Sequence, residues 1–417
     1  MLFCQFIVNF IEKFLLKNYY SNLYLNLIMD EILKIEEIAF GGYGIAKKNG
    51  YVVFVPYSIP GEEVKIQIKE TKKDYAIGEI INIIKPSSQR KEPECRYFGK
   101  CKGCSYQHIK YEEELKIKTK QISQIFKQIG KMENPPVKNI ISANSPNFYR
   151  NKVRLRYKKI KQKHLFGFIN NEEKRTIDIE ECKIASPLIN NKIKEIRNDK
   201  FKIFSEKNIR SYNLSIVEDG TKVITTFEPE THLKVKVLEN VFNYSLNSFF
   251  QVNRTIFKDL FDFISDAIDS FSLQKKTLWD LYCGVGFFGI ILHNKFEEVF
   301  FVEQNKISFE FLKKNIEENN IKNAKILKGD ASLAFNHYNR CDTLIVDPPR
   351  TGCGDDVKNN IIKLKPSLLI YISCNPSTLA RDSLFFIKNG YKIETIQPFD
   401  FFPRTKHIEC AAIFTLN

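Results

Sequence analysis

The fold is decided by residues 278–286, which read LWDLYCGVG. The apolar run around Asp280 predicts a buried strand, and Gly284 and Gly286 predict a sharp turn into a helix. A strand, a glycine turn and a helix in this order are typical of a nucleotide-binding pocket. A short Gly-x-Gly pattern also occurs in ordinary strand-to-helix turns, so the surrounding sequence has to distinguish the two readings.

Further strands follow this turn at intervals filled by helical patterns. They are expected at residues 297–303, 324–330, 343–347 and 368–372. Strands that alternate with helices predict βαβ units and a largely parallel sheet, so the C-terminal part of the chain belongs to the α/β class.

Two acidic residues at strand ends suit a nucleoside. Glu303 closes the second strand about twenty residues after the glycine turn, where an acid binds ribose hydroxyls. Asp330 closes the third strand, where a carboxylate accepts a hydrogen bond from an adenine amino group. The third glycine of the dinucleotide pattern is missing, so S-adenosylmethionine fits better than NAD.

Cys374 follows the fifth strand, in the turn Ser-Cys-Asn-Pro at residues 373–376. Catalytic groups of open α/β sheets collect where strands end, and an ionised thiol there is a nucleophile. A lone cysteine is as often a small buried apolar residue. Glu409 precedes the apolar strand 411–414 and is either a desolvated proton acceptor or a solvated surface residue.

The N-terminal half of the chain has a different sequence pattern, with short strand-like segments in place of alternating strands and helices. Short strands and glycine turns over residues 32–84 predict a small antiparallel barrel with basic side chains. A basic strand at 149–158, with Arg154, Arg156 and Lys158 on one face, predicts a stripe facing phosphates rather than a merely solvated surface. The cysteines in C-x5-C-x2-C spacing, with a later one, suit structural zinc or an iron–sulfur cluster: Cys95, Cys101, Cys104 and Cys182.

The amino-acid composition limits the kinds of binding partner and the cellular compartment that we expect. The chain has 64 Lys and Arg against 49 Asp and Glu, a net charge of +15 that favours phosphate backbones or anionic membranes. No apolar run is long enough for a membrane span. Ten cysteines without a secretion signal indicate a reducing compartment, so we expect a cytoplasmic protein. We also expect no obligate protein partner. Residues 1–28 are expected to be a misassigned start or a disordered extension.

Taken together, these motifs resemble the RNA (uracil-5-)-methyltransferase family, and residues 32–84 resemble its RNA-binding TRAM barrel. The matching stretches are residues 248–253 (SFFQVN), 281–286 (LYCGVG), 347–350 (DPPR), 373–376 (SCNP), 380–382 (ARD) and 407–409 (HIE).

The resemblance implies a Rossmann-like class I methyltransferase domain and covalent catalysis. In that family the residue matching Cys374 attacks C6 of a flipped-out uridine, and the residue matching Glu409 removes the C5 proton. Phe249 matches an aromatic residue that stacks on the target base. The expected S-adenosylmethionine contacts are Gln251, Tyr282, Glu303, Asp330 and Asp347.

The resemblance also implies an organisation and a metal cofactor. We expect a TRAM-like barrel at residues 30–88, an iron–sulfur and β-rich RNA-binding domain at 89–240, and a methyltransferase domain at 241–417. The four cysteines match ligands of a 4Fe-4S cluster in the family. The expected substrate is 23S ribosomal RNA, with tRNA second. The alternatives are an RNA cytosine-5-methyltransferase, an adenine amino-methylating enzyme and a non-catalytic RNA-binding protein.

Overall fold

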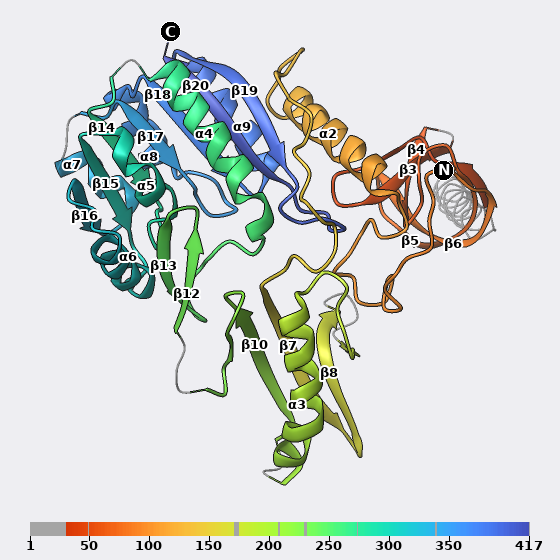
Figure 1. Ribbon diagram of the computed structural model, residues 1–417. Coiled ribbons are helices and arrows are strands. Elements are labelled where there is room, and N and C mark those ends of the chain that lie inside the picture. The colour runs from red at the N-terminus through yellow and green to blue at the C-terminus, as the bar shows by residue number, and fades with distance from the viewer. Residues whose placement is uncertain are drawn as a thin grey trace, which may run out of the picture. The chain divides into compact units, whose positions relative to one another are not determined.

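The computed structural model describes residues 31–416, except 49, 171–174, 207–208, 229–231, 273 and 338–339. Residues 1–28, including Cys4, therefore lie outside the described residues. The chain forms two compact units, which are described separately (Figure 1). None of the described helices is long and apolar enough to span a membrane.

The first unit is a curled six-stranded sheet that ends near Glu92 and includes His108–Lys110. The strand order is β1-β5-β6-β4-β3-β2. The strands are β1 (Glu31–Lys34), β2 (Glu37–Ile38), β3 (Tyr43–Lys48), β4 (Tyr51–Pro56), β5 (Glu63–Thr71) and β6 (Tyr75–Lys85). Every second residue along β5 points inward at first, so Val64 and Ile66 enter the core. The pairing is antiparallel as predicted, except that β4 and β6 run parallel.

The middle of the chain forms an antiparallel sheet covered by one helix. The strand order is β11-β10-β7-β8-β9. The elements are β7 (Lys152–Ile160), β8 (Lys163–Asn170), β9 (Arg175–Asp178), α3 (Pro187–Glu206), β10 (Ser211–Glu218) and β11 (Val223–Thr225). Val153, Leu155 and Tyr157 of β7 are buried with Ile189 and Ile193 of α3, which confirms the predicted inward face of this strand.

A hairpin follows, formed by β12 (His232–Val237) and β13 (Asn240–Ser245). Val241 of β13 pairs with Lys236 of β12. The boundary expected at residue 241 therefore falls inside paired strands.

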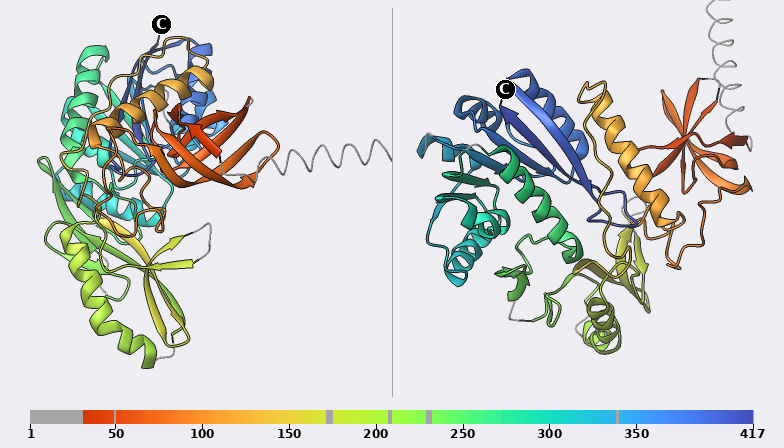
Figure 2. Two further views of the ribbon diagram at one scale, coloured as in Figure 1. Left: turned by 90° about the vertical axis from the view of Figure 1, so that its right-hand side faces the viewer. Right: turned by 45° about the horizontal axis from the view of Figure 1, so that its top comes forward.

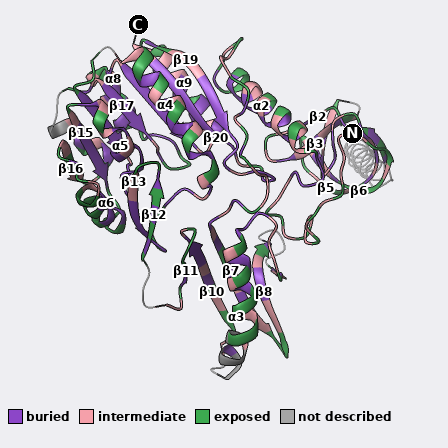
Figure 3. Cartoon of the chain, in the orientation of Figure 1, coloured by how far each residue is buried: buried purple, intermediate pink, exposed green. Residues whose placement is uncertain are grey.

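The C-terminal part is a seven-stranded sheet with strand order β16-β15-β14-β17-β18-β20-β19. Its strands are β14 (Thr277–Leu281), β15 (Glu298–Glu303), β16 (Ala324–Lys328), β17 (Thr343–Val346), β18 (Leu368–Ser373), β19 (Tyr391–Phe399) and β20 (Glu409–Leu416). The first five run parallel, whereas β20 is antiparallel to both β18 and β19. Figure 3 shows that β14, β17 and β18 are buried along their length, because helices cover both faces.

One face of this sheet packs against α4 (Phe257–Phe271), α5 (Phe287–Leu292) and α6 (Lys306–Glu318). The other packs against α8 (Asp355–Leu364), α9 (Pro376–Lys388) and α2 (Tyr111–Gln128), as Figure 2 lets the reader follow. Residues 136–141 then lie along the edge strand β19, where Lys138 N–H donates to Ile396 at 2.9 Å. Two segments placed by sequence in the middle domain thus complete the C-terminal sheet.

Candidate active site

Cys374 lies between the end of β18 and the start of α9, and it is partly exposed. Asn375 caps the helix by accepting a hydrogen bond from the Ser377 N–H, and Pro376 occupies the first turn, where no N–H is needed. The thiol therefore lies next to the positive end of a helix dipole, which favours a thiolate.

The strand register brings Glu409 beside Cys374. Ser373 of β18 pairs with Cys410 of antiparallel β20, so continuing the register by one residue sets Cys374 opposite Glu409. Directly opposed residues of an antiparallel pair have Cβ atoms about 5 Å apart. Glu409 is buried at 3% exposure, which excludes the reading of it as a solvated surface residue.

Asp347 and Arg350, in the loop after β17, change the pKa values of Cys374 and Glu409. Burial raises the pKa of Cys374, and the charges of Glu409 and Asp347 raise it further. Arg350 opposes these effects through its charge and a hydrogen bond to the thiol. Burial raises the pKa of Asp347 to about 7, and burial with the nearby Asp347 raises the pKa of Glu409 well above its usual range.

A small cavity lies beside this group, and four of the predicted residues line it: Phe249, Gln251, Tyr282 and Asp347. The Phe249 ring is 64% exposed, whereas Gln251 is buried. The glycine turn after β14 forms its floor, with positive φ at Tyr282 (61°), Gly284 (59°) and Gly286 (91°). A Cβ on Gly286 would approach Ile290 to 2.7 Å, so only glycine fits there.

Glu303 supports the turn. One carboxylate oxygen accepts from Gly284 N–H at 2.8 Å, and the other accepts from Asn305 N–H. Asp330 is exposed and does not line the cavity. Its carboxylate accepts from Ser332 N–H at 2.9 Å and caps the short helix η3 (Ala331–Leu333). The structure thus brings four expected cofactor residues to one place and leaves Asp330 at its margin.

Comparison with known proteins identifies the family. The family profile described as tRNA (Uracil-5-)-methyltransferase matches residues 209–416, and the TRAM domain profile matches residues 33–81. An uncharacterized RNA methyltransferase of Aquifex aeolicus is 31% identical over 92% of this chain and 98% of its own. The chain belongs to the RNA (uracil-5-)-methyltransferase family.

Two further relatives agree with this assignment. An uncharacterized RNA methyltransferase of Halalkalibacterium halodurans is 29% identical over 92% of this chain and 96% of its own. The crystal structure of Pyrococcus abyssi tRNA (uracil-54, C5)-methyltransferase with S-adenosyl-L-homocysteine matches with a TM-score of 0.71. It covers 93% of this chain and 100% of that chain at 22% identity, and it shows the same fold. The predicted class I methyltransferase fold with an N-terminal TRAM domain is confirmed, and the protein is an S-adenosylmethionine-dependent RNA methyltransferase.

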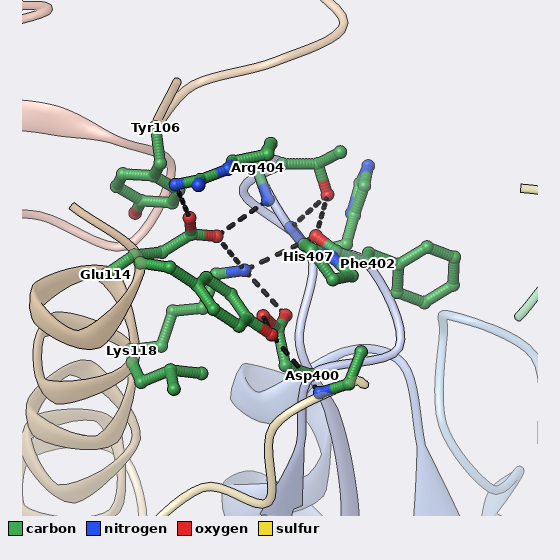
Figure 4. A network of polar contacts seen from close by, with 12 residues as sticks. Tyr106, Glu114, Lys118, Asp400, Phe402, Arg404 and His407 are labelled. Carbon is green, nitrogen blue, oxygen red and sulfur yellow. Dashed lines mark hydrogen bonds and ion pairs between the residues drawn. The ribbon is translucent and has the colours of Figure 1, made fainter. Parts of the chain in front are cut away.

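A buried ionic network holds the loop of this methyltransferase that leads into Glu409 (Figure 4). Lys118 of α2 has no exposed surface and contacts Glu114 at 2.8 Å and Asp400 at 2.7 Å. Glu114 in turn accepts hydrogen bonds from Arg404 through its backbone N–H at 2.7 Å and through its guanidinium at 3.0 Å. Burial lowers the pKa of Lys118, but the two carboxylates outweigh it and raise the pKa.

The same loop contacts the cysteine-bearing segment. The Arg404 carbonyl accepts from Ser105 N–H at 2.8 Å and from Tyr106 N–H at 3.1 Å, immediately after Cys104. Pro403 accepts from the Tyr149 hydroxyl at 3.1 Å. Sequence reasoning missed these residues because the partners are separated by more than 250 positions.

The four predicted cysteines line one hollow of about 350 Å³: Cys95, Cys101, Cys104 and Cys182. Burial raises the pKa of Cys101 to about 11 and also raises those of Cys104 and Cys182. Within the described ranges, no three His, Cys, Asp or Glu side chains lie close enough together to hold a single metal ion.

The basic strand β7 has a role that the sequence did not indicate. Lys152 Nζ donates to the carbonyls of Leu246 at 3.0 Å and Ser248 at 3.1 Å, so it fixes the loop that carries Phe249. Arg156 donates to Thr176 at 2.7 Å. Arg154 is exposed, so of the three predicted phosphate contacts it has the clearest access to solvent.

Proposed function

We propose that this methyltransferase methylates C5 of uridine in RNA through a covalent adduct between Cys374 and C6. The observation that carries the proposal is the register of β18 and β20, which sets a partly exposed thiol opposite a buried carboxylate. C5 of an unactivated pyrimidine is a poor nucleophile, and addition of a thiolate at C6 makes it an enolate-like carbon nucleophile.

The residues act in a fixed order. The Cys374 thiolate adds to C6, and C5 then takes the methyl group of S-adenosylmethionine as the sulfur–methyl bond breaks and S-adenosylhomocysteine leaves. Glu409 then removes the C5 proton, and the electron pair released re-forms the C5–C6 double bond as the sulfur leaves. The net change is one methyl group gained by uridine and one proton released.

The electrostatics favour the neutral forms of both groups. Burial and the neighbouring carboxylates raise the pKa values of Cys374 and Glu409. The methyl donor is a sulfonium cation, and a positive charge placed near Asp347 lowers both pKa values. Bound donor therefore prepares the nucleophile and the base together, and Arg350 acts in the same direction.

We propose 23S ribosomal RNA as the substrate, methylated at one or more uridines. A net charge of +15 and a TRAM domain suit a long phosphate backbone. The alternative substrate is tRNA, which the family profile and the Pyrococcus abyssi protein carry in their names. Mapping 5-methyluridine in 23S rRNA and tRNA from a deletion strain tests the choice: loss from 23S rRNA is expected, and loss from tRNA alone would overturn it.

We also propose that the four cysteines hold a 4Fe-4S cluster with a structural role. The donor set fits, because four thiols face one hollow and a cluster of several ions bridges ligands that are too far apart for one ion. Bound iron would keep the thiols deprotonated despite their raised pKa values. Anaerobic purification should give a brown protein with broad visible absorption. A colourless protein with stoichiometric zinc would contradict this assignment.

The expected division at about residues 30–88, 89–240 and 241–417 remains a proposal, with one modification. Residue 241 lies within the paired strand β13, and a hydrogen-bonded strand is a poor site for proteolysis. Limited proteolysis is therefore expected not to cut within the paired strands β12 and β13. A stable fragment beginning at residue 241 would favour the original boundary.

A further inference from the structure

Phe148 combines two unusual features. Its side chain is 45% exposed, and its backbone is in the left-handed region with φ of 57°. A phenylalanine in this region is strained, because its Cβ is too close to the following carbonyl oxygen. Among the described phenylalanines of the second unit, Phe148 and Phe249 are the two that are exposed.

The strain at Phe148 is held by hydrogen bonds on both sides. The Phe148 N–H donates to the Lys183 carbonyl at 3.0 Å, and the Arg150 N–H donates to Ile184 at 2.8 Å. Tyr149 is buried, and its hydroxyl donates to Pro403 in the loop before Glu409. Strained residues that persist in this way cluster at functional and ligand-binding sites.

The segment of Phe148 is joined to the segment of Phe249. Asn151 N–H donates to the Val252 carbonyl at 3.0 Å, and Asn151 Nδ2 donates to Gln251 at 3.1 Å. Lys152 fixes the carbonyls of the loop that carries Phe249. Arg150 and Asn253 form an antiparallel bridge, so Phe148 and Phe249 extend from opposite ends of these two bonded segments.

We propose that Phe148 is a second base-stacking site, which takes an unpaired nucleobase of the same RNA a few nucleotides away from the uridine held at Phe249. The inference rests on the function proposed above. A flipped uridine leaves its neighbours unstacked, and single-stranded bases stack on exposed aromatic rings without regard to sequence. An exposed, strained aromatic ring on a segment that is hydrogen-bonded to the one carrying Phe249 has the chemistry for this ligand.

The test uses Phe148→Gly, with Leu238→Gly as the matched control. Leu238 is also exposed, at 41%, and also left-handed, with φ of 52°, but it lies in the turn between β12 and β13. Glycine relieves the strain at either position, so both variants should melt at a higher temperature than the wild type.

RNA binding should separate the two variants. Phe148→Gly is expected to weaken binding of a short single-stranded RNA about 5- to 100-fold, from the usual energy of one stacked base. Leu238→Gly should bind as the wild type does, and Phe148→Trp should restore affinity. In a series of RNAs that carry one 2-aminopurine at successive positions around the target uridine, at least one probe should be quenched by the wild type and not by Phe148→Gly.

Unchanged affinity and quenching in Phe148→Gly would overturn the stacking site. These binding readouts are independent of methyl transfer, so they separate this inference from the proposed function. If the wild type made no 5-methyluridine yet quenched the probe through Phe148, the proposed function would fail alone. Equal loss of binding in Leu238→Gly would show that the effect is not specific to Phe148.

Discussion

At the scale of single residues, burial governs the protonation of the site. Asp280 of β14 has no exposed surface, and its Oδ2 accepts from Gly289 N–H at 2.8 Å. In the part of the chain that the structure describes, its Oδ1 has no hydrogen-bond partner. Burial therefore raises the pKa of Asp280 to about 8, and the carboxyl is protonated at neutral pH.

This pKa predicts how stability depends on pH. Between about pH 4 and pH 8 the folded state holds a proton on Asp280 that the unfolded state has lost, so stability falls as pH rises. Each such group contributes a slope of up to about 1.4 kcal/mol per pH unit. Asp280→Asn should flatten the slope of the unfolding free energy in urea titrations over this range. An unchanged slope would contradict the raised pKa.

Single residues were predicted unevenly from the sequence. Cys374 and Asp347 follow strands of the parallel sheet, which collects strand ends on one edge. Glu409, Phe249 and Gln251 stand in compact motifs outside the parallel strands. The pairing of Cys374 with Glu409 needed the register of β20, which no local pattern specifies. Lys152 was given no role from the sequence, and only the fold reveals the carbonyls to which it donates.

At the scale of elements, α2 is fastened to the loop before Glu409 by charges rather than by apolar packing alone. A buried ion pair adds little stability compared with apolar residues, but removal of one partner leaves an uncompensated charge. Lys118 neutralises two buried carboxylates, Glu114 and Asp400, so its loss affects both ends of the network.

Lys118→Met should therefore lower the unfolding free energy by about 3–5 kcal/mol, the usual cost of breaking a buried pair. Lys116→Met is the control on the same helix, because Lys116 is 74% exposed and contacts Glu113 at 3.6 Å. The control should change stability by less than about 0.5 kcal/mol. Equal effects in chemical denaturation would show that the network does not secure α2.

Six strands of the C-terminal sheet were predicted to within two residues, since each is a short apolar run bounded by turns, whereas β19 was not predicted. The sequence placed α2 and residues 136–141 in the middle domain, whereas they pack on the C-terminal sheet. The apolar residues of these segments show that another element must cover them. They do not identify that element, which is more than 250 residues away in the chain. The parallel pairing of β4 with β6 was also missed, because no local pattern specifies the direction in which two strands pair.

At the scale of the whole molecule, the positive charge predicts strongly salt-dependent RNA binding. Each phosphate neutralised by Lys or Arg releases condensed counterions, so the binding constant falls with salt. With several phosphate contacts, affinity for RNA should fall about 10³-fold between 50 and 200 mM salt. A nearly salt-independent affinity, measured by filter binding, would show that the basic residues do not face the backbone.

The central claim is covalent catalysis by Cys374 with Glu409 as the base, and one measurement tests it most directly. Glu409→Gln is incubated with RNA and with S-adenosylmethionine labelled on the methyl group, and the mixture is denatured and separated by mass. We predict a protein–RNA adduct that carries the label, because methylation proceeds while the C5 proton stays in place. The adduct should be absent in Cys374→Ala, which should also lack turnover while it still binds RNA. Methylation of uridine by Cys374→Ala, with no adduct in Glu409→Gln, would contradict the account.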